Sequence, residues 1–174
     1  DSRVDPAIVT NCKPGDLFVI RNVANLVPPY EEDNSYHGTS AALEFGVCYL
    51  EIKHIIIFGH SQCGGITSLV KNSFTGGQSR GFIEKWMELA KPAYNAALSE
   101  GSEITTGNMT ELCGKHSLIN SLKNLQTFSW IAQKIAKNEI TLHGWYFDLP
   151  TGTIKVISEE SQEFVDINQY YEFF

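Results

Sequence analysis

The sequence predicts an α/β protein with a mainly parallel β-sheet core flanked by helices, and three observations support this fold class. Apolar strand-like runs alternate along the chain with segments of helical pattern, which is typical of parallel sheets covered by helices. One run, HIIIF at residues 54–58, is almost wholly apolar, as in strands buried on both faces of such a sheet. Near the end, a strand–turn–strand pattern predicts a C-terminal antiparallel strand pair.

Turn and cap signals mark the elements before that apolar run. Pro14–Gly15 is a turn signal, and the apolar residues 16–20 after it predict a buried strand. Residues 22–37 predict a loop, because they contain two consecutive prolines and several polar side chains. Residues 40–52 predict a helix that is apolar over most of its surface and begins after a Thr–Ser capping pair.

Helices are predicted to fill most of the chain between the HIIIF strand and the C-terminal pair. The expected segments are a helix from Gly65 to about residue 72, a helix at 82–98, one or two helices at 109–137 broken near Thr127–Phe128, and strands at 140–149 and 153–158. The PTG sequence between the two strands is their turn. Residues 160–174 are too aromatic to lie free, so we expect them to pack against the rest of the chain.

Length, composition and charge define the class of protein. The chain has 174 residues, of which 43% are hydrophobic and 11% aromatic, which suits one globular domain over residues 1–174 and excludes a disordered chain. The formal net charge of −7 and the absence of a Lys/Arg cluster argue against nucleic-acid binding. No apolar run approaches the roughly 20 residues that span a bilayer, so we expect no membrane partner.

His60 and Cys63 directly follow the HIIIF strand, where open α/β sheets place their ligand sites. Imidazole and thiolate are both zinc ligands, and the spacing of three residues lets both reach one ion across a tight turn. Three glycines, Gly59, Gly64 and Gly65, permit a sharp backbone path there. The alternative is an ordinary loop with a buried cysteine, and two candidate ligands alone leave both interpretations open.

Two other stretches could reach the same edge of the sheet. Asp1 and Arg3 lie two residues apart, so in an extended segment their side chains share a face and can form a hydrogen-bonded ion pair. The alternative is a pair of frayed charges at a chain end. The RNVANLVPPY stretch, residues 21–30, follows the predicted 16–20 strand and is either part of the site or a plain loop.

Together these stretches resemble the β-class carbonic anhydrases, and the SRVDP and VPPY sequences are most similar to the plant-type subgroup. The matching sequences, in order, are DSRV, GDLFVIRNVANLVPPY, GTSAALEFGVCYLEIKHIIIFGHSQCGGI, NSLKNL and HGWYFD. The resemblance implies a lyase that hydrates CO2 reversibly to bicarbonate and a proton with a Zn2+ cofactor. It also implies a homodimer or higher homo-oligomer. The four scattered cysteines suit reduced thiols better than a disulfide framework, which indicates the cytoplasm or an organelle matrix.

The resemblance implies a role for each candidate residue. His60 and Cys63 match two of the three zinc ligands, and the third, a cysteine two residues before the family's D-S-R motif, would lie upstream of Asp1. Arg3 would keep Asp1 ionised, so that Asp1 orients a zinc-bound hydroxide, and in a closed state Asp1 could itself bind zinc. The family's N-terminal arm, which embraces a partner subunit, is also expected to be absent from this chain.

The family pattern further implies a pocket for the substrate. Phe18, Val23 and Phe45 would line an apolar CO2 pocket, partly across a dimer interface, and the backbone amide of Gly64 would bind bicarbonate. Plant-type relatives carry tyrosine where this chain has Phe45, so a polar group is lost there. For Phe18 and Phe45 the alternative is ordinary core packing.

The remaining cysteines and histidines have no motif that would assign them to the site. Cys12, Cys48 and Cys113 are not placed like the family's first cysteine and are expected to be reduced, structural thiols. Arg21 is expected to anchor its loop. The histidines without motif support, expected on the surface or in the core, are His37, His54, His116 and His143.

Two alternative functions stay open on the sequence. One is a catalytically silent bicarbonate-binding or scaffold protein on the same fold. The other is a relative that hydrolyses carbon disulfide or carbonyl sulfide at the same metal.

Overall fold

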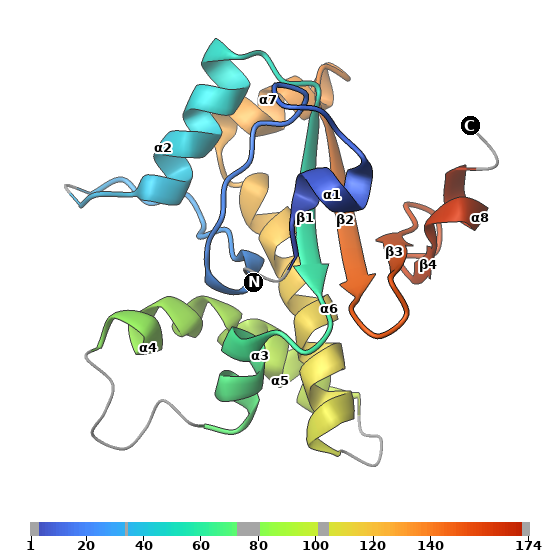
Figure 1. The fold of residues 1–174 in the computed structure, drawn as a ribbon. Coiled ribbons are helices and arrows are strands. Elements are labelled where there is room, and N and C mark those ends of the chain that lie inside the picture. The colour runs from blue at the N-terminus through green and yellow to red at the C-terminus, as the bar shows by residue number, and fades with distance from the viewer. Residues whose placement is uncertain (1–3, 34, 73–80, 101–104, 172–174) are drawn as a thin grey trace.

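Two parallel strands lie at the centre of the molecule, with a long helix along their back (Figure 1). The computed structural model describes residues 4–33, 35–72, 81–100 and 105–171. The parallel strands are β1 (His54–His60) and β2 (Thr141–Asp148), and the helix is α6 (Thr106–Leu125). The sheet continues antiparallel through β3 (Thr153–Ile157) and β4 (Phe164–Asp166), in the order β1-β2-β3-β4. The α/β class is confirmed, with a mixed sheet over the described residues.

Helices and short helical turns make up most of the other described elements. The remaining α-helices are α1 (Pro6–Thr10), α2 (Gly38–Glu44), α3 (Gly64–Val70), α4 (Phe82–Met87), α5 (Lys91–Ser99), α7 (Ser129–Ala136) and α8 (Ile167–Tyr171). The predicted helix at 40–52 is α2 followed by a π-helical turn, Phe45–Tyr49. The predicted helix at 82–98 is α4 and α5, joined by a 3-10 turn at Glu88–Ala90. The expected break near Thr127 separates α6 from α7.

α6 joins two hydrophobic core clusters within the described residues. Its C-terminal half, with Leu118 and Leu125, packs against the buried side chains of β1 and β2. Its N-terminal half, with Met109 and Cys113, packs in a second cluster with α3, α4 and α5. The helix therefore holds α3, which follows the loop after β1, in a fixed place relative to the sheet.

The predicted buried strand at 16–20 is wrong. These residues have no regular secondary structure, and the apolar side chains of residues 17–20 are between 37% and 46% exposed. Together with α1, this segment faces β1 and β2 across a cavity of about 730 Å³. The apolar side chains of residues 17–20 are of the kind usually buried in a folded protein. On the side of this segment away from the cavity, no other described part of the chain covers them.

β1 is buried fully on only one of its two faces. Ile55 and Ile57 each expose 7% of their surface and belong to the core cluster that contains α6 side chains, whereas Ile56 exposes 36% of its surface. The expectation of burial on both faces therefore holds for one face only, because the segment facing the other does not pack directly onto it.

The predicted C-terminal strand pair is confirmed as β2 and β3, and the aromatic tail docks as expected over its described part. β4 pairs with β3, and Phe164 packs edge-on against Tyr146 with ring centroids 6.1 Å apart. α8 contacts β3 and β4. Of the helices that the structure describes, none combines the length and apolarity needed to cross a bilayer.

Candidate metal centre

β1 carries His60 to the carboxyl edge of the sheet, and α3 begins directly after Cys63. His60 is the last residue of β1 and lies opposite Phe147 of β2. The chain then turns sharply at Gln62, whose φ of 55° lies in the left-handed region, and Cys63 takes an extended conformation as the N-cap of α3. Both side chains are buried, His60 at 6% exposed and Cys63 at 5%. The turn thus brings an imidazole and a thiol into one buried place.

The backbone carbonyl of Ser61 fixes the orientation of the His60 ring. His60 Nδ1 donates to this oxygen at 2.7 Å, which makes Nε2 the ring nitrogen that can coordinate a metal. Ser61 is itself held by β2 and the turn after it: its amide donates to Phe147 O at 2.8 Å, and its Oγ accepts from Leu149 N at 2.9 Å. Such a hydrogen bond on the second nitrogen is usual for histidines that bind zinc.

The Cys63 thiol lies in surroundings that favour its ionised form. Burial raises the pKa of Cys63, but a hydrogen bond from the His60 side chain and the backbone amides of Ile66 and Gly65 lower it, and the net shift is downward. The two amides belong to the first turn of α3, where N–H groups have no partner within the helix. Because the thiolate is the form that binds metal, this environment suits a ligand.

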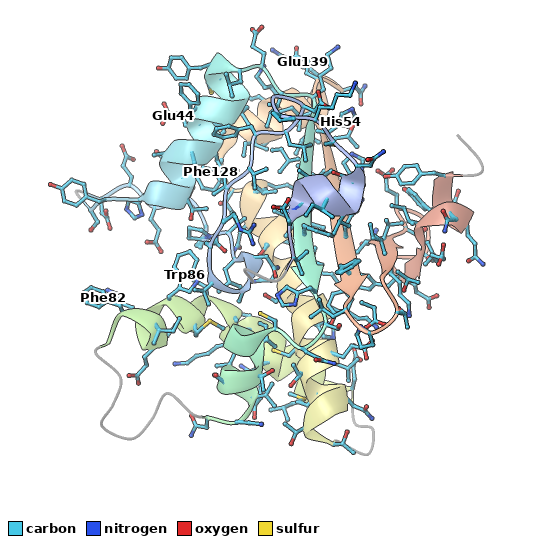
Figure 2. The ribbon with its side chains drawn as sticks, viewed as in Figure 1. Glu44, His54, Phe82, Trp86, Phe128 and Glu139 are labelled. Carbon is cyan, nitrogen blue, oxygen red and sulfur yellow. The ribbon has the colours of Figure 1, made fainter. Side chains whose placement is uncertain are left out.

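Two neighbouring glycines at the start of α3 have different surroundings. A Cβ on Gly65 would lie 2.9 Å from Val23 Cγ1 and 3.3 Å from Ala24 Cβ, so α3 packs closely on the 3-10 turn Val23–Asn25. A Cβ on Gly64 would meet no described atom within 4 Å, so this position is open. Trp86 of α4 (Figure 2) also holds this turn, because its Nε1 donates to Val23 O at 2.8 Å.

The three predicted pocket side chains lie outside the core. Phe18, Val23 and Phe45 are 45%, 46% and 48% exposed, and the rings of Phe18 and Phe45 lie 6.0 Å apart. Phe18 lines the cavity in front of β1, which also reaches His60, whereas Val23 and Phe45 are not among its described lining residues. Of these three side chains, Phe18 alone is among the described residues that line the cavity with His60.

The predicted Asp1–Arg3 pair lies outside the described residues. Val4, the next residue, is 6% exposed and lines the cavity that reaches His60. Arg21, which is predicted to anchor its loop, donates through Nη2 to Val4 O at 2.9 Å and so ties that loop to the segment around Val4. The segment that begins at Val4 thus lines the same cavity as His60.

The described residues supply two zinc donors rather than a complete set. Within residues 4–33, 35–72, 81–100 and 105–171, no group of three or more His, Cys, Asp and Glu side chains is arranged to hold a metal ion. Cys113 does not complete the pair: burial and the charge of Cys63 raise its pKa to about 12, which disfavours the thiolate. An oriented imidazole and a thiol of lowered pKa nevertheless match the nitrogen and sulfur preference of zinc.

Sequence reasoning located both donors but missed Ser61. It is a small polar residue between two candidate ligands, and nothing in its local pattern distinguishes it from Gln62. Its role depends on Phe147 and Leu149, which the fold brings from β2 and the turn after it.

The fold and this half-site define an α/β protein with a histidine and a cysteine at the carboxyl end of a central parallel strand pair. The family model for carbonic anhydrase matches residues 1–154. The structure resembles that of the β-carbonic anhydrase CcaA with a TM-score of 0.88 and 33% identity, over 95% of this chain and 79% of that one. The chain therefore belongs to the β-carbonic anhydrase family, as its sequence motifs predict.

Two further relatives give the same result. A tetrameric β-carbonic anhydrase from Sordaria macrospora has a TM-score of 0.77 and 30% identity, over 91% of this chain and 76% of that one. The β-carbonic anhydrase 5 of Arabidopsis thaliana, named as chloroplastic, is 40% identical over 148 residues, which are 85% of this chain and 48% of the relative. This chain spans about half the length of that curated relative.

Proposed function

We propose that this protein catalyses the reversible hydration of CO2 to bicarbonate and a proton, with a zinc ion held by His60, Cys63 and a cysteine upstream of Asp1. The observation that carries the proposal is the buried pairing of His60 with Cys63 at the end of β1, within a carbonic anhydrase fold. When bound, zinc supplies a Lewis acid that lowers the pKa of a water ligand toward neutrality.

Different hydrogen bonds hold the two proposed ligands, His60 and Cys63. His60 coordinates through Nε2, because Nδ1 is engaged by the Ser61 carbonyl and the ring cannot rotate without losing that bond. Cys63 coordinates as a thiolate, and the amides of Gly65 and Ile66 remain to stabilise its charge. Burial of both side chains strengthens these interactions, since the local dielectric constant is low.

Asp1 and Arg3 act as the catalytic dyad in this proposal. Asp1 accepts a hydrogen bond from the nucleophile and orients it toward CO2, and Arg3 keeps Asp1 ionised and turned away from the metal. In a closed state, loss of the pair would let Asp1 bind zinc in place of the nucleophile. The position of Val4 beside the cavity that reaches His60 supports this assignment.

CO2 is apolar, so we assign its binding to apolar side chains next to His60. Phe18 supports this from the cavity in front of β1. Val23 and Phe45 are assigned to the same pocket through contact with a second subunit, which their exposure permits. The amide of Gly64 is assigned to bicarbonate, and the open space at that residue leaves room for the anion.

The partner that we propose is a second copy of the chain. One surface, which we call the apolar surface, comprises Leu17, Phe18, Val19, Ile20, Phe45, Tyr49 and Leu50, all at least 37% exposed. Side chains of this size and number are usually covered in a stable assembly. The tetrameric Sordaria macrospora relatives support a homo-oligomer.

The compartment that we propose is the cytoplasm or an organelle matrix. The chloroplastic relative from Arabidopsis thaliana supports the second of these.

The test is to measure zinc content and stopped-flow CO2 hydration on the full-length protein. We expect about one zinc ion per chain at this centre and hydration well above the buffer rate. Cys63→Ser should lose both signals, whereas the matched control Cys48→Ser, at an exposed thiol, should keep both. A protein that binds zinc through Cys63 without hydrating CO2 would contradict the catalytic proposal, and retention of both signals in Cys63→Ser would contradict the ligand assignment.

A further inference from the structure

A second pair of nitrogen donors lies at the opposite end of the central strands. His54 begins β1, and Figure 2 shows it at the end of the sheet far from α3. β1 spans seven residues from His54 to His60, so at about 3.3 Å per residue the two histidines are roughly 20 Å apart. A ligand at this end would be separate from the candidate metal centre.

The strand register brings His143 beside His54. His54 pairs with Thr141 and Ile56 with His143, so the two histidines are diagonal neighbours on one face of the parallel pair. His54 Nδ1 and His143 Nε2 are 3.1 Å apart, and the ring centroids are 5.3 Å apart with an interplanar angle of 44°. An imidazolium only donates hydrogen bonds, so this contact requires at least one neutral ring, the form that binds a metal.

The nitrogen separation matches that of two ligands on one ion. With metal–nitrogen bonds of about 2.0–2.1 Å, two nitrogens at angles between octahedral and tetrahedral lie about 2.9–3.4 Å apart. The pair already falls within this range, and each ring must turn so that both lone pairs point at a common ion instead of at each other. His54 is exposed to solvent and His143 is half-buried, so an ion has access and water can complete its coordination.

One acidic side chain, Glu159, lies near this pair. Glu159 borders the same small hollow as His143, and its negative charge acts on the His143 ring. Both histidines also line the larger cavity in front of β1, where Lys53 and Arg21 are among the other lining residues. The other two histidines outside the metal centre are different, because each contacts a carboxylate rather than a second imidazole: His37 with Asp33 and His116 with Glu100.

We propose that His54 and His143 form a second metal site, for a divalent transition-metal ion with affinity for imidazole, such as Ni2+, Cu2+ or Zn2+. The site bridges the beginnings of β1 and β2, with two nitrogen ligands from the protein and water in the other positions. Two imidazoles on a rigid sheet bind more tightly than one, because the second binds at the effective concentration of an intramolecular group. Oxygen-preferring ions such as Mg2+ and Ca2+ are not expected there.

The test is a Ni2+ titration by calorimetry on the intact protein, after the candidate metal centre has been loaded with zinc. We expect one saturable Ni2+ site, and His54→Gln or His143→Gln should each weaken it at least about tenfold. His37→Gln and His116→Gln are matched controls and should leave it unchanged. The untagged parent chain and the two control variants should be retained on immobilised Ni2+ more strongly than His54→Gln and His143→Gln.

Two outcomes would overturn this proposal. One is Ni2+ affinity that stays the same in both His54→Gln and His143→Gln. The other is an equal loss of Ni2+ affinity in His37→Gln, which would mean that Ni2+ binds to separate single imidazoles.

Since His54 is exposed, its replacement is not expected to disturb folding, and the circular dichroism spectrum and melting temperature of metal-free His54→Gln check this. The zinc content and activity at His60 and Cys63 are measured separately, so the two metal sites are tested independently.

Discussion

At the scale of single residues, the four thiols should differ strongly in reactivity. Cys113 is completely buried in α6 and has a pKa of about 12, whereas Cys48 is exposed. Since the thiolate is the reactive form, iodoacetamide at pH 8 should modify Cys48 quickly in dissociated chains, such as dilute Tyr49→Glu protein, and Cys113 only after unfolding. Peptide mapping by mass spectrometry over time measures both rates, and Cys48→Ser should remove the fast phase. Modification of Cys113 at a rate near that of Cys48 in folded protein would show that its burial is wrong.

Residue types and spacing predict the candidate ligands well, but they do not predict the hydrogen bonds that hold those ligands in place. His60 and Cys63 follow an apolar strand at a spacing that suits one metal ion, and the structure buries them together. Ser61 could not be assigned from its neighbours, because its carbonyl and hydroxyl gain their roles only when β2 lies beside β1. The same holds for His54 and His143, whose contact depends on strand register.

At the scale of elements, the packing of α3 on the Val23–Asn25 turn depends on Gly65. Gly65→Ala would place a methyl group 2.9 Å from Val23 Cγ1 and 3.3 Å from Ala24 Cβ, and neither neighbour has a flexible side chain that can move away. We expect a loss of about 1–3 kcal/mol in the free energy of unfolding. Gly64→Ala is the matched control: it meets no described atom within 4 Å and gains helix propensity, so it should stay within about 1 kcal/mol of the parent.

Urea unfolding of both glycine variants, followed by circular dichroism, measures these free energies. Equal stability of Gly64→Ala and Gly65→Ala would contradict the close packing of α3 on this turn.

Helix and strand periodicity predicted most elements but not the state of residues 16–20. An apolar run predicts that its side chains are buried, but it does not predict whether the same chain or a second chain buries them. β1 could likewise be recognised from its apolar run, while the cavity on one of its faces depends on how the 16–20 segment packs. Local patterns therefore predict elements better than they predict the contacts made between them.

At the scale of the whole molecule, the apolar surface should hold two copies of the chain together. Tyr49 is 71% exposed and stacks on Phe45 with ring centroids 5.6 Å apart. Tyr49→Glu would place a carboxylate in that contact, and burial of an unpaired charge should raise the dimer dissociation constant at least about 100-fold. The matched control is Phe82→Glu, because Phe82 is 87% exposed on α4 and lies away from α2 (Figure 2). Sedimentation velocity over a range of protein concentrations measures the assembly. A monomeric parent protein, or equal dissociation in both variants, would show that this surface is not the interface.

Because Phe45 belongs to the apolar surface and is assigned to the CO2 pocket, Tyr49→Glu should also lower hydration activity, and raising the protein concentration should restore part of that activity.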